Sequence, residues 1–147
     1  MKKYLLLLAT AFAITITANA QKEEKENKKN VKAPAAVLEA FKKQFPGATA
    51  KWELEDGKYE ANFKHNGQEM SALFETNGTM TESEVEIKIS ELPAAATSYL
   101  KTHYKGVAIK EAAKITKANG EINYEAEVKG KDVLFDTAGK FLKEAKD

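Results

Sequence analysis

The stretches that decide the fold are Leu-Phe-Glu-Thr-Asn-Gly at residues 73–78 and Leu-Phe-Asp-Thr-Ala-Gly at residues 134–139. In each, adjacent leucine and phenylalanine side chains precede a turn signal that ends in glycine, as at the end of a strand in a hairpin. The same six-residue pattern therefore occurs once in each half of the chain. This indicates an internal duplication.

Further matches extend the duplication in the same order along the chain. They are Pro-Ala-Ala at 34–36 and 93–95, Phe-Pro-Gly at 45–47 against Tyr-Lys-Gly at 104–106, and Tyr-Glu-Ala at 59–61 and 124–126. The offsets between matching positions lie between 59 and 65 residues. We therefore predict two related units, residues 33–88 and residues 89–147.

Each unit begins with the pattern of an amphipathic helix. In the first unit Pro34 suits the first helical turn, and Pro46-Gly47 ends the pattern. Apolar side chains recur between them at steps of three and four residues, at Val37, Leu38, Phe41 and Phe45. This predicts a helix over about residues 33–45. Pro93 and Gly106 bound an equivalent stretch in the second unit.

The rest of each unit has the pattern of an antiparallel meander. Turn dipeptides separate alternating segments at Asp56-Gly57, Asn66-Gly67, Asn77-Gly78, Asn119-Gly120, Lys129-Gly130 and Ala138-Gly139. Three turns separate four strands in each unit. We therefore predict an α+β fold with two tandem units, each a helix packed on a four-stranded antiparallel sheet. Since one unit is small for a stable core, the two are expected to pack together or to share a continuous sheet.

The first 20 residues have the pattern of a secretory signal peptide. Lys2 and Lys3 precede an apolar run from Tyr4 to Ile16, and Thr17-Ala18-Asn19-Ala20 fits a cleavage site. An uncleaved anchor is the alternative, although the run is short for a membrane span. Residues 21–32 contain almost no apolar side chain and are predicted to be a charged linker, with an interaction tail as the alternative. We expect a periplasmic or secreted protein that does not insert into a membrane after cleavage.

Composition and motifs argue against several classes of function. The formal net charge is only +1, whereas proteins that bind nucleic acid typically carry a large positive charge. The chain has no cysteine, which excludes thiol catalysis and Cys-ligated metals. His65 and His103 lie in different units without metal-binding spacing, and no serine lies in a Gly-x-Ser-x-Gly motif. We therefore predict no catalytic residues, no metal site and no cofactor, and a protein that is not an enzyme.

Two leucines are the candidate binding residues. Leu73 and Leu134 fall on the opposite strand face from the phenylalanines that follow them, at equivalent places in the two units. They are candidates for a contact surface with another protein, and packing between the units or burial at a sheet edge is the alternative. Glu82, Glu84 and Glu86 alternate along one predicted strand, where a solvated face is the simplest interpretation and a cation site the alternative.

These motifs together resemble the PepSY-like family of beta-lactamase-inhibitor-like proteins. The resemblance rests on the export signal, the Pro-led helix ending in Phe-Pro-Gly, the Tyr-Glu-Ala strand and the Phe-(Asp/Glu)-Thr-x-Gly turn. It covers most of residues 33–145 and implies a repeated helix-on-sheet fold.

Members of that family are exported bacterial proteins, and the related PepSY domains are associated with restraint of peptidases. The resemblance therefore implies a non-enzymatic binding module of the cell envelope, with a protein partner of unknown identity, such as a peptidase that it inhibits or regulates. The alternative is a periplasmic protein that binds a small ligand or a cation.

Overall fold

The computed structural model describes residues 31–146, so the predicted signal peptide and nearly all of the predicted linker lie outside the described residues. The described chain forms two α-helices, one short 3-10 helix and eight strands. Their order is α1 (Ala35–Gln44), β1 (Ala50–Glu55), β2 (Lys58–His65), β3 (Gln68–Phe74), β4 (Met80–Glu86), η1 (Ile89–Glu91), α2 (Ala94–His103), β5 (Ile109–Lys117), β6 (Ile122–Val128), β7 (Lys131–Asp136) and β8 (Phe141–Lys146).

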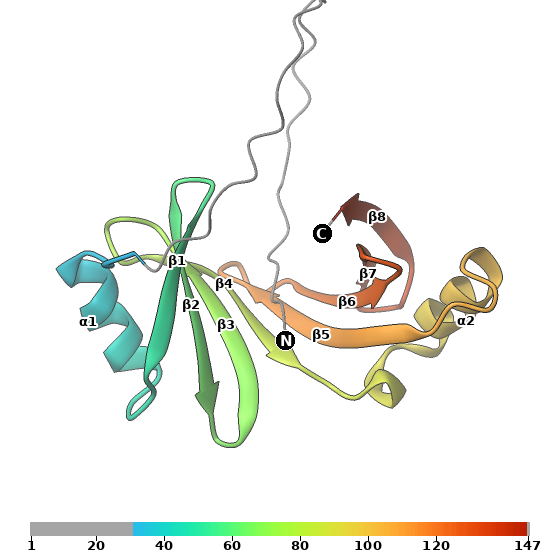
Figure 1. The fold of residues 1–147 in the computed structure, drawn as a ribbon, viewed down its shortest axis with the longest axis horizontal. Coiled ribbons are helices and arrows are strands. Elements are labelled where there is room, and N and C mark those ends of the chain that lie inside the picture. The colour runs from blue at the N-terminus through green and yellow to red at the C-terminus, as the bar shows by residue number, and fades with distance from the viewer. Residues whose placement is uncertain (1–30, 147) are drawn as a thin grey trace, which may run out of the picture.

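All eight strands form one antiparallel sheet in the order of the chain, β1 to β8 (Figure 1). The structure thus confirms an α+β fold, and in place of a four-stranded sheet in each unit it has one eight-stranded sheet. The reason is that β4 pairs with β5 over Glu82–Glu86, so that no sheet edge is left between the halves. The sequence is compatible with two packed units or with a shared sheet, and the structure has the shared sheet.

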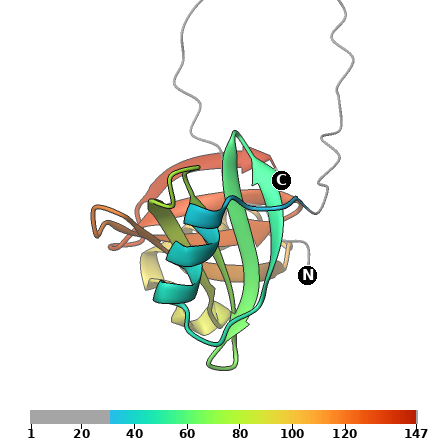
Figure 2. The same cartoon turned by 90° about the vertical axis from the view of Figure 1, so that its left-hand side faces the viewer.

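Both helices pack on the same face of this sheet, one over each half (Figures 1 and 2). One buried cluster combines Val37 and Phe41 of α1 with Phe74, and a second combines Leu100 of α2 with Phe135. Strand register places both clusters on one face, because a line of paired residues runs across the sheet from Met70 through Val85, Lys114 and Tyr124 to Phe135. The sheet bends away from the helices, which therefore lie on its outer, convex side.

The repeated Phe-(Asp/Glu)-Thr-x-Gly turn fixes each helix against its hairpin. Gly78 has a φ of 88°, and a Cβ added there would lie 2.6 Å from the carbonyl oxygen of Ala36 in α1. Gly139 has a φ of 81°, and its added Cβ would lie 2.7 Å from the backbone nitrogen of Ala96 in α2. Each position therefore requires glycine for both its backbone angle and its contact with the first turn of a helix.

Substitution of these glycines separates the two requirements. Gly78→Ala and Gly139→Ala introduce both strained backbone and a clash, whereas Gly57→Ala and Gly130→Ala introduce only the strain, since nothing lies within 4 Å of the added Cβ. We expect the first pair to lose about 1–3 kcal/mol more free energy of unfolding than the second, measured by urea denaturation. Equal losses in all four variants would show that the contact with the helix is unimportant.

Candidate binding site

The sheet face opposite the helices is concave and lies between the two halves (Figure 1). No described helix covers it. We call it the concave face. Strand register assigns to it one row that runs from Glu60 through Leu73 to Glu82, and a second row that runs from Glu86 through Ala113 and Glu125 to Leu134. The same alternation that buries apolar side chains under the helices therefore places glutamates here, together with Leu73, Ala113 and Leu134.

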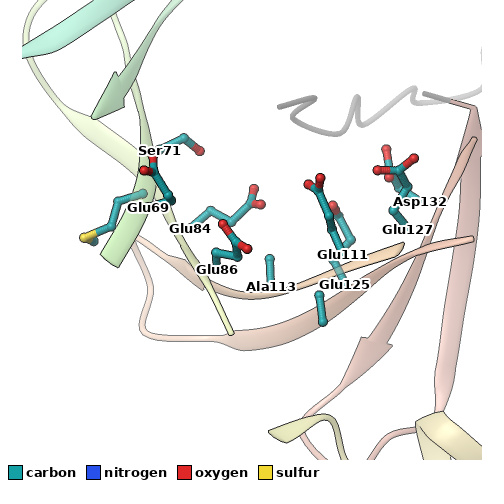
Figure 3. Close-up of a pocket in the computed structure, with 11 residues that line it drawn as sticks. Glu69, Ser71, Glu84, Glu86, Glu111, Ala113, Glu125, Glu127 and Asp132 are labelled. Atoms are coloured by element: carbon teal, nitrogen blue, oxygen red, sulfur yellow. The ribbon is translucent and has the colours of Figure 1, made fainter. Parts of the chain in front are cut away.

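Carboxylates from five neighbouring strands, β3 to β7, line a pocket in the concave face. We call it the acidic pocket. It is lined by Glu69, Met70, Ser71, Glu84, Glu86, Glu111, Ala112, Ala113, Glu125, Glu127 and Asp132. In Figure 3 the carboxylates of Glu84, Glu111 and Glu125 point into the same space. Residues from both halves of the chain therefore build one site.

Strand pairing explains why these carboxylates meet. Glu86 of β4 lies opposite Ala113 of β5, which lies opposite Glu125 of β6. Directly paired residues of antiparallel strands point to the same face of the sheet. The small side chain of Ala113 leaves open space between the two glutamates. A second row brings Glu127 of β6 opposite Asp132 of β7.

Several of these acidic side chains are buried. Glu125 is 7% exposed, Glu127 is 8% exposed and Asp132 is 5% exposed. Glu127 has a compensating partner, because Lys110 donates to its carboxylate at 2.7 Å. Within the described part of the chain, the Oε2 atom of Glu125 has no hydrogen-bond partner. Glu125 is therefore a buried acidic group with an unpaired carboxylate oxygen among residues 31–146.

Burial raises the pKa of Glu125 well above its usual value, because it withdraws water from the charged form. The negative charges of Glu84, Asp132, Glu82 and Glu127 raise that pKa further. Burial also raises the pKa of Glu82, where nearby Lys117 acts in the opposite direction. Burial and the neighbouring carboxylates therefore both disfavour the charged form of Glu125.

Glu60 and Glu125 occupy equivalent positions in the two halves. Each is the middle residue of a Tyr-Glu-Ala repeat, and Glu60 is only 1% exposed. Glu60 lies opposite Leu73, as Glu125 lies opposite Leu134. The signal for these buried glutamates was present in the sequence as a charged residue repeated at the centre of an apolar motif. In the sequence this motif indicates a duplication and a family resemblance, and neither reveals that the glutamate is buried.

The two predicted contact leucines lie on the concave face. Leu73 is half-buried and lies opposite Glu60 and Glu82. Leu134 is 4% exposed and lies opposite Glu125 and Lys143, so its side chain offers little surface to a partner. Neither leucine lines the acidic pocket. Their role in contacting another protein stays a prediction.

The histidines lie apart, each against an aromatic ring. The ring of His65 lies edge-on to Phe45 at 5.9 Å between centroids, and that of His103 stacks on Tyr99 at 3.8 Å. Within residues 31–146, no three histidine, aspartate or glutamate side chains are arranged to hold a metal ion. None of the helices in this range is long and apolar enough to cross a membrane.

The family model described as "Putative beta-lactamase-inhibitor-like, PepSY-like" matches the chain twice, over residues 20–82 and 57–143. The chain therefore belongs to this family, which confirms the resemblance of the sequence motifs. No curated protein matches the chain.

Solved structures from Bacteroides share the fold. A BLIP-like protein of Bacteroides fragilis is 27% identical with a TM-score of 0.62, and the match covers 79% of this chain and 87% of that one. A DUF2874 family protein of Bacteroides uniformis is 21% identical with a TM-score of 0.68, covering 78% and 89%. A protein of Bacteroides eggerthii described as "putative periplasmic" is 19% identical with a TM-score of 0.70, covering 79% and 90%.

The burial of Glu125 predicts a dependence of stability on pH. Because its pKa is higher in the folded than in the unfolded protein, its burial becomes costly as pH rises from about 4.3 through the folded pKa. We expect Glu125→Gln to raise the melting temperature at pH 8, with a gain that disappears towards pH 4. Exposed Glu39→Gln on α1 is the control and should change stability by less than about 0.5 kcal/mol. A pH-independent effect of Glu125→Gln would contradict this account.

Proposed function

We propose that the protein is an exported, non-enzymatic binding module of the bacterial cell envelope, which inhibits or regulates another protein, such as a peptidase, by contacting it through the concave face. Export is supported by the signal peptide pattern and fits the periplasmic description of the Bacteroides eggerthii protein. A binding role fits the family description and the BLIP-like protein of Bacteroides fragilis.

The burial of the Glu125 carboxylate is the observation that supports this proposal most directly. The carboxylate is buried in the concave face, and its Oε2 atom lacks a hydrogen-bond partner among the described residues. A buried polar group without a partner destabilises a fold, so packing alone does not explain a glutamate at this position. Local choices that cost stability are expected at sites that bind or react. The concave face is therefore the surface that a binding function best explains.

The composition of the acidic pocket favours binding over catalysis. Its polar lining consists of carboxylates and Ser71, with no histidine, and the chain has no cysteine. Both histidines lie against aromatic rings elsewhere. The pocket thus lacks a histidine or thiol to activate a nucleophile.

Substitution of Leu73 tests the surface. Leu73→Lys places a charge in the concave face, whereas Leu54→Lys is a matched change at a side chain that is 45% exposed on β1, on the helix side of the sheet. Leu134 is unsuitable, because a buried lysine there would destabilise the fold. The protein comprising residues 21–147, which contains every described element, is used to capture partners from an envelope extract.

We expect a stoichiometric partner to bind the original protein and the Leu54→Lys variant, and to be lost from Leu73→Lys. Mass spectrometry identifies the captured protein, and circular dichroism checks that both variants are folded. Undiminished capture by a folded Leu73→Lys variant would show that the partner binds elsewhere.

A further inference from the structure

We infer that the acidic pocket receives lysine or arginine side chains presented by the partner protein. This inference rests on the proposed function and adds the chemistry of the partner. It concerns the recognition of basic groups by the carboxylates at the centre of the concave face.

The charge of the pocket lining is complementary to that of a basic side chain. The lining of the acidic pocket holds seven carboxylates and no lysine or arginine. Two lysines outside the lining pair with lining glutamates. Lys110 lies 2.7 Å from Glu127, and Lys64 lies 3.5 Å from Glu69. An approaching cation therefore meets more carboxylates than lysines, which attracts it and orients its approach.

Glu125, at the centre of the acidic pocket, lacks a hydrogen-bond donor that a basic side chain can supply. Its side chain is more than nine-tenths buried, it points into the pocket, and its Oε2 atom has no hydrogen-bond partner in the described chain. A guanidinium or ammonium group supplies the donors that this carboxylate lacks. Binding of a basic side chain would therefore supply a donor to a buried carboxylate oxygen that is unpaired in the unbound protein.

The spacing of the carboxylates favours an organic cation over a metal ion. The lining extends over four strand-to-strand steps, from Glu69 of β3 to Asp132 of β7, which corresponds to roughly 15–20 Å along the sheet. A calcium ion gathers its oxygen ligands within about 2.6 Å. No three side chains within residues 31–146 are arranged for such an ion. Separate basic side chains can instead pair with separate carboxylates.

The lining also suits the stems of long basic side chains. Ala113 lies between Glu86 and Glu125 in the strand register and supplies apolar atoms next to their carboxylates. Lysine and arginine bury their aliphatic stems on apolar surface while their charged ends contact polar groups. Around Ala113 the concave face therefore offers an apolar contact for such a stem beside the carboxylates.

The test is fluorescence anisotropy with a labelled hexa-arginine peptide and the protein comprising residues 21–147. We expect saturable binding that weakens as salt is added, and no binding of a hexa-glutamate peptide. Glu125→Gln and Glu84→Gln are each expected to weaken hexa-arginine binding by about tenfold, because each removes a charge-assisted contact worth about 1.5 kcal/mol. Glu39→Gln, with the same change of net charge on α1, should weaken binding less than about twofold.

Loss of affinity in Glu125→Gln does not arise from unfolding, since that substitution is expected to stabilise the fold. Equal binding by all three variants would overturn the inference, because it would show non-specific attraction. Melting curves with calcium chloride supply a further outcome. Failure of the peptide to bind, together with calcium-dependent stabilisation that Glu125→Gln abolishes, would overturn the inference in favour of a metal site.

The failure of this inference is distinguishable from failure of the proposed function. If hexa-arginine does not bind but Leu73→Lys still abolishes capture of the partner, the concave face remains the binding surface and only the basic chemistry is wrong.

Discussion

Pairing between β4 and β5 is the interaction on which the concave face depends. The ladder runs from Glu82, opposite Lys117, to Glu86, opposite Ala113. Without it, each helix and its four strands would form a small unit with an exposed sheet edge. With it, the two halves bend around a shared space, and the carboxylates of β4 face those of β6 across β5. The acidic pocket therefore belongs to the joined sheet and to neither half alone.

The two faces of the sheet serve different purposes. The convex face buries the aromatic and aliphatic side chains that hold α1 and α2. The concave face buries Glu60 and Glu125, which water would solvate better. A fold selected only for stability would place apolar or exposed side chains there. The two helical cores on the convex face stabilise the fold, while the concave face holds these buried glutamates.

Much of this architecture could be predicted from the sequence, because it depends on local rules. The helix boundaries follow from Pro34 and Pro46, and the turns follow from their glycines. The pairing of β4 with β5 could not be predicted, because alternation gives the face of a strand and not its partner. The burial of Glu125 could not be predicted either, because it arises from the curvature of the joined sheet. A glutamate in an alternating strand is otherwise expected to be exposed to solvent. Only its repetition at Glu60 gave a signal.

The most direct test of the account is a carbon NMR titration of the Glu125 carboxyl group, with and without the hexa-arginine peptide. The account predicts a pKa above the usual value of about 4.3 in the unbound protein, which falls when the peptide binds, because a nearby positive charge favours the carboxylate. An ordinary pKa in the unbound protein would show that burial does not disfavour the charged form of Glu125. A raised pKa that the peptide leaves unchanged would show that the cation binds elsewhere.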